Sequence, residues 1–108
     1  MAQDFTRYIA RATGTSGATI FTANSDDAVI SVRLANILGT AITADVFVTV
    51  SAADYYLVKG ISIPSGSSIE LIDGASRFVV VSGDALKVVC SDNSALDVWV
   101  SVVDAIST

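Results

Sequence analysis

The stretch that decides the fold is Ala28-Val29-Ile30-Ser31-Val32-Arg33-Leu34, in which apolar and polar side chains alternate. Successive side chains of a β-strand point to opposite faces of its sheet. The alternation therefore predicts a half-buried strand, with Ile30, Val32 and Leu34 facing the core and Ser31 and Arg33 facing outward.

The same alternation recurs along most of the chain. It is clear in Ala44-Asp45-Val46-Phe47-Val48-Thr49-Val50, recurs at residues 61–63, 69–71, 86–90 and 96–102, and is accompanied by β-branched and aromatic side chains at 5–12 and 18–22. Turn sequences such as Pro64-Ser65-Gly66 and Ser82-Gly83-Asp84 separate these segments. About eight short strands at roughly 8- to 12-residue spacing predict an all-β, antiparallel β-sandwich, either Ig-like or jelly-roll-like. The expected core contains Ile30, Val32, Leu34, Val46, Val48, Val50, Leu86, Val88, Val98 and Val100.

Length and composition indicate one domain spanning residues 1–108, with 52% hydrophobic residues to build its core. No apolar run approaches the roughly 20 residues that a membrane-spanning helix needs, so we expect no membrane partner. The first residues lack the apolar segment of a secretory signal, and we therefore expect synthesis in the cytoplasm without export.

Charge and residue usage argue against several functions. The formal net charge is −5 and the six Lys and Arg residues are scattered, so we expect no nucleic-acid partner. The chain has no histidine, its carboxylates lie mostly in or beside turns, and Cys90 is its single cysteine. We therefore expect no enzyme activity, no catalytic residues, no cofactor and no metal site. The lone Glu70 alternates outward and is expected to be solvated.

Four apolar side chains stand on the expected outer faces of strands. Phe47 lies between Asp45 and Thr49, and Trp99 lies between Asp97 and Ser101, with Val89 and Val103 in similar positions. Aromatic residues are enriched in protein interfaces, so Phe47, Trp99, Val89 and Val103 are predicted interface residues, with Phe47 and Trp99 on one sheet face. The alternative is that other segments of the same chain cover these faces.

Three segments resemble small virion proteins of tailed phages, particularly phages of cyanobacterial and marine hosts. The first is residues 56–71, with Ile63-Pro64-Ser65-Gly66-Ser67-Ser68-Ile69-Glu70 at its end. The others are Ser82-Gly83-Asp84-Ala85-Leu86-Lys87-Val88 and Leu96-Asp97-Val98-Trp99-Val100-Ser101. Together they fall within roughly the last two thirds of the chain.

The resemblance implies a phage virion structural protein, most simply a capsid decoration (cement) protein that binds the particle through protein–protein contacts. A neck, tail or fibre-associated protein is the alternative within the virion. The implied partners are copies of the chain itself and other virion proteins, such as the major capsid protein or neck and tail proteins. A carbohydrate-binding or adhesion module is a second class, in which Trp99, Tyr55 and Tyr56 would contact sugar rings.

Overall fold

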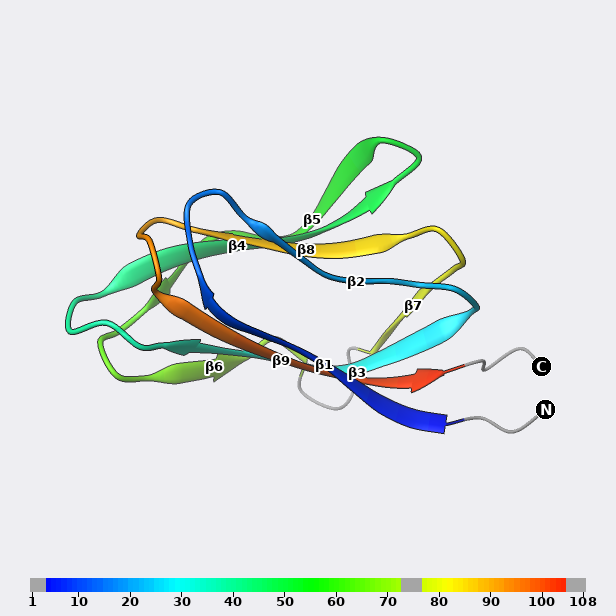
Figure 1. Cartoon of the computed structure of the whole chain (residues 1–108), viewed down its shortest axis with the longest axis horizontal. Helices are drawn as coiled ribbons and strands as arrows, with labels where there is room; N and C mark the ends of the chain where they lie inside the picture. Colours follow the sequence, from blue (N-terminus) through cyan, green and yellow to red (C-terminus); the bar gives the residue numbers. More distant parts are fainter. Residues whose placement is uncertain (1–3, 73–76, 105–108) are drawn as a thin grey trace.

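The computed structural model describes residues 4–72 and 77–104, and all regular structure in this part is β-strand (Figure 1). Two antiparallel sheets pack face to face, which confirms the predicted all-β sandwich. The strands are β1 (Asp4–Thr13), β2 (Ala18–Thr22), β3 (Asp27–Asn36), β4 (Ile42–Val50), β5 (Ala53–Ile63), β6 (Ser68–Glu70), β7 (Phe78–Val80), β8 (Ala85–Cys90) and β9 (Leu96–Asp104).

The strand order identifies the kind of sandwich. Sheet A has the order β1-β9-β3-β6, with β7 also paired to β3, and sheet B has the order β2-β8-β4-β5. The antiparallel pairs are nested within one another in the sequence. The innermost pair is β4 with β5, followed outward by β3 with β6 and β7, then β2 with β8, and finally β1 with β9. This is one long hairpin with its tip between β4 and β5, rolled up so that β9 also meets β3 and β8 also meets β4. Of the two expected topologies, the chain therefore adopts the jelly roll.

The core lies between the two sheets and is built from alternate residues of their strands. Most of the predicted core residues are buried in it, namely Val32, Leu34, Val46, Val48, Leu86, Val88, Val98 and Val100. Val50, at the end of β4, is only partly buried against this cluster. Because β4 and β5 continue into a hairpin beyond the main body (Figure 1), the end of β4 is less covered than its middle.

Ile30 is a wrong prediction, and a β-bulge is the reason. The register of β3 against β9 shifts between Val29 and Ser31, so one extra residue is inserted in β3 at this point. Val29, which is 0% exposed, takes the inward position, whereas Ile30 is half-buried. From Val32 onward the predicted alternation holds.

A buried amide ties together the loops at one end of the sandwich. Asn36 is 3% exposed, and its Nδ2 lies 2.8 Å from the carbonyl oxygen of Thr40, 3.0 Å from that of Ile63 and 3.2 Å from that of Pro64. Its Oδ1 accepts a hydrogen bond from the backbone N–H of Leu38 at 2.9 Å. One side chain thereby fixes the connection from β3 to β4 against the end of β5.

Candidate binding surface

The four predicted interface residues lie on two different surfaces. Trp99 and Val103 are on β9 and point outward from sheet A, whereas Phe47 on β4 and Val89 on β8 point outward from sheet B. The prediction that Phe47 and Trp99 share a sheet face is therefore wrong. Alternation separates inward from outward positions within a strand, but it does not say to which sheet the strand belongs.

Phe47 is covered by its own chain. It is 8% exposed, and its ring lies 4.9 Å, centroid to centroid, from the ring of Tyr56 on the neighbouring strand β5. The Lys59 ammonium in turn lies 4.5 Å from the centroid of the Tyr56 ring. For Phe47, the alternative explanation is therefore correct, because residues of its own chain cover it. The interface role of Trp99, Val89 and Val103 stays a prediction.

An apolar row crosses the outer face of sheet A near one end of the sandwich. Phe5 on β1 is opposite Val103 on β9, which is opposite Ala28 on β3, which is opposite Val79 on β7. Phe5 is 82% exposed and Val79 is 58% exposed. At a strand spacing of about 4.8 Å, this row is about 14 Å long. Of its members, the sequence indicated only Val103, because cross-strand neighbours cannot be found without the strand order.

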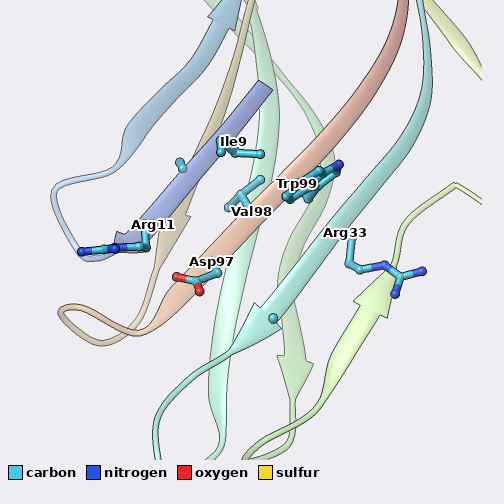
Figure 2. A pocket seen from close by; sticks show the side chains of 8 residues that line it. Ile9, Arg11, Arg33, Asp97, Val98 and Trp99 are labelled. Atoms are coloured by element: carbon cyan, nitrogen blue, oxygen red, sulfur yellow. The ribbon is translucent and has the colours of Figure 1, made fainter. Parts of the chain in front are cut away.

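Trp99 forms a second feature on the same face, four residues from Val103 along β9. It lies opposite Ile9 on β1 and Arg33 on β3, and it is 48% exposed. The Arg7 guanidinium carbon lies 5.1 Å from the centroid of the indole ring, a cation–π distance. Figure 2 shows Trp99 on β9 between Ile9 on β1 and Arg33 on β3, with the Arg33 side chain extending away from the indole.

A hollow of about 410 Å³ opens beside Trp99 (Figure 2). Ile9, Val98 and Trp99 border it on one side, and its lining extends to Arg11, Arg33 and Asp97. A second, adjoining hollow is lined by Ser31, Arg33, Trp99 and Ser101. Trp99 and Arg33 line both, so they stand between two depressions in the sheet surface.

The charge of this surface is opposite to that of the whole chain. Arg7, Arg11 and Arg33 are three of the six basic residues in a chain of net charge −5. Among the residues that the structure describes, Arg7 and Arg11 form no ion pair, and Arg33 Nε is 3.8 Å from Glu70 Oε1. We refer to Arg7, Arg33 and Trp99 with their two hollows as the Trp99 surface.

The carboxylates beside this surface are already hydrogen-bonded to other groups. Asp97 Oδ1 accepts a hydrogen bond from the backbone N–H of Ala12 at 2.8 Å. Glu70 accepts one from Ser31 Oγ at 2.7 Å and one from the Val32 N–H at 2.8 Å. Glu70 is exposed, as expected, and its carboxylate also accepts hydrogen bonds from backbone and hydroxyl donors of β3.

A small polar cluster lies elsewhere, around the start of β3 and the end of β9. Ser25 Oγ is 2.7 Å from Asp27 Oδ1 and 2.9 Å from Asp104 Oδ1. Burial raises the pKa of the Tyr8 hydroxyl above its ordinary value of 10.0, and the charges of Asp104 and Asp27 raise it further. Within residues 4–72 and 77–104, no three carboxylate or thiol side chains are grouped so that they could hold a metal ion.

Tyr55 and Tyr56 do not join Trp99 in one aromatic platform. Both are exposed on β5 of sheet B, whereas Trp99 belongs to sheet A. The joint sugar-binding role considered for the three residues therefore lacks the necessary geometry, and only Trp99 adjoins the arginines. The described residues also include no helix with the length and apolar character needed to cross a membrane.

Comparisons with known proteins add a likeness in fold. No protein-family model matches the chain, and no curated protein matches it. The chain is similar to a solved structure of the Bacillus endospore appendages, which are described as forming "a novel family of disulfide-linked pili". The TM-score is 0.57 at 19% sequence identity, over 98% of this chain and 88% of that one. At this identity the likeness shows a shared fold.

Proposed function

We propose that the chain is a structural subunit that associates with copies of itself and with other proteins of a larger assembly, without catalysing a reaction. The apolar row on sheet A carries this proposal. Phe5 and Val79 are large, exposed and joined through Val103 and Ala28 across four hydrogen-bonded strands. A contiguous apolar patch on a rigid sheet is typical of a protein contact surface.

Within this class, we infer a tailed-phage virion protein, made in the host cytoplasm and bound to the particle as a capsid decoration (cement) protein. The resemblance of residues 56–71, 82–88 and 96–101 to such proteins supports this finer proposal. A neck, tail or fibre-associated protein is the alternative. In either place the partners would be other virion proteins, and the row would supply part of the contact.

The pilus protein with the same fold supports assembly in general, because it is a subunit of a filament. Those pili are described as disulfide-linked. In this chain the single cysteine, Cys90, is buried in the core, with Sγ 3.1 Å from the carbonyl oxygen of Asp92. A buried thiol cannot reach a neighbouring subunit, so we propose non-covalent contacts for this chain.

The experiment compares Phe5→Ser and Val79→Ser with the parent chain by sedimentation and by electron microscopy over a range of concentrations. Burial of one large apolar side chain is worth about 1.5–3 kcal/mol, so each variant should weaken association roughly 10- to 150-fold. Ile37→Ser is the matched control, because Ile37 is 49% exposed but lies just beyond β3, outside the row. Melting temperatures should stay near that of the parent.

Two results would count against assembly through this row. One is a parent chain that stays monomeric alone and does not bind particles. The other is an Ile37→Ser variant that loses association as strongly as Phe5→Ser. The finer proposal has its own test, which is whether capsid, portal or tail genes adjoin the gene, followed by electron microscopy of particles that contain the chain.

A further inference from the structure

The Trp99 surface has features that the folding of this chain does not require. Arg7 lies over the exposed indole of Trp99, and Arg33 is opposite Trp99 on the neighbouring strand, so two arginines flank one exposed aromatic ring. The Glu70 carboxylate is 3.8 Å from Arg33, but among the described residues neither Arg7 nor Arg11, which lines the larger hollow, forms an ion pair. The arrangement therefore points to an anionic ligand.

The hydrogen-bonding groups next to the indole narrow the class of ligand. Ser101 and Ser31 are opposite each other on β9 and β3, and both line the hollow that Trp99 and Arg33 share. Ile9 and the indole give the other hollow an apolar side. A sugar ring has a C–H face that packs on an aromatic surface, together with hydroxyl groups that bond to serine and arginine. A carboxylate on that ring would pair with a guanidinium.

Two other anionic partners fit less well. An extended acidic peptide usually binds by adding a strand to a sheet edge, but Trp99 is on β9, whose two edges already pair with β1 and β3. A nucleic acid needs a track of cations for its successive phosphates, and the rest of this chain is acidic. The hollow of about 410 Å³ lies within the usual size range of small-ligand sites, about 300–1,000 Å³.

We propose that the Trp99 surface binds an acidic saccharide, with a uronic acid ring against the exposed indole and its carboxylate held by Arg7 and Arg33. Trp99 lies four residue pairs along β1 and β9 from the apolar row and Arg7 lies two, so the site uses none of the residues of the row. A structural subunit with such a site would attach its assembly to an acidic polysaccharide.

The chain provides its own probe, because Trp99 is its single tryptophan. We would titrate the full chain with oligogalacturonate and follow indole fluorescence, with a neutral maltooligosaccharide of equal length as the comparison. Calorimetry would give the affinities of Arg7→Gln and Arg33→Gln, since replacing Arg7 also changes the fluorescence of the free chain. Lys87→Gln removes the same charge from the outer face of sheet B and is the matched control.

We expect oligogalacturonate to change the fluorescence and the neutral sugar to have little effect. Each arginine variant should bind about tenfold more weakly, because it loses a charge-assisted hydrogen bond, while Lys87→Gln should bind like the parent. Added salt should weaken binding. Circular dichroism should show all variants folded.

Other outcomes would overturn the proposal. No response to the acidic sugar up to roughly 10 mM would exclude a useful site. Equal affinity for the neutral sugar would remove the role of the arginines. Binding of hexaglutamate or of a single-stranded oligonucleotide as tightly as the uronate would show a site for acidic peptide or nucleic acid instead. If all variants keep the oligomeric state of the parent chain, a failure of sugar binding overturns only the saccharide site and not the proposed assembly role.

Discussion

Replacing Asn36 with alanine should destabilise the fold strongly, although the side chain lies far from any apolar contact surface. The amide has two Nδ2 hydrogens, which three carbonyl oxygens share at 2.8–3.2 Å, and its Oδ1 accepts a further bond at 2.9 Å. Counting three net hydrogen bonds at about 1 kcal/mol each gives a loss of about 3 kcal/mol. Because Asn36 is 3% exposed, water cannot readily replace these bonds.

The assay is urea and thermal unfolding followed by circular dichroism. For a domain of about 100 residues, 3 kcal/mol corresponds to a fall in Tm of roughly 12–24 °C. Asn36→Asp should be worse than alanine, because it keeps the shape but turns a carboxylate toward three carbonyl oxygens. Asn24→Ala, in the exposed turn before β3, is the control and should change stability by less than about 0.5 kcal/mol. A loss below about 1 kcal/mol in Asn36→Ala would refute the reasoning, since the buried carbonyls would then not depend on this amide.

Three further outcomes follow from the core. Val29→Ala should cost about 2 kcal/mol in urea unfolding and Ile30→Ala less than about 1 kcal/mol, although isoleucine is larger, because the bulge buries Val29; the reverse order would contradict the bulge. Because the pKa of Tyr8 is raised in the folded state, its neutral hydroxyl contributes stability that is fully present below pH 10.0 and is lost as the pH rises through the raised pKa. Tyr8→Phe should therefore lessen the fall in Tm above about pH 10. An identical alkaline profile would count against this. The Cys90 thiol should react with a maleimide only when the chain unfolds, and rapid labelling of the native chain would show that it is accessible.

Alternation in the sequence predicted most of the core and every described strand except β7, because burial of one sheet face imposes a period of two. The three residues of β7, Phe78, Val79 and Val80, are all apolar and show no alternation. It failed at Ile30, because Val29 and Ile30 are both apolar and the alternation does not show which of the two faces the core. It also failed for Phe47 and Trp99, because assignment to a sheet depends on pairings between distant segments. The arginines beside Trp99 come from β1 and β3, tens of residues away in the sequence. Such a cluster becomes visible only when the strand order is known.

The position of β9 between β1 and β3 has a consequence for synthesis. On the ribosome, β1 emerges first, yet its partner in sheet A comes after every other strand in chain order. Until then β1 has an unpaired backbone, and β3 lacks the neighbour that buries one of its edges. Long-range pairings of this kind fold slowly and leave edges exposed to other chains. Crowded nascent copies could therefore exchange β9 strands, so the rate of translation, as well as the final contacts, would influence how many correctly closed subunits form.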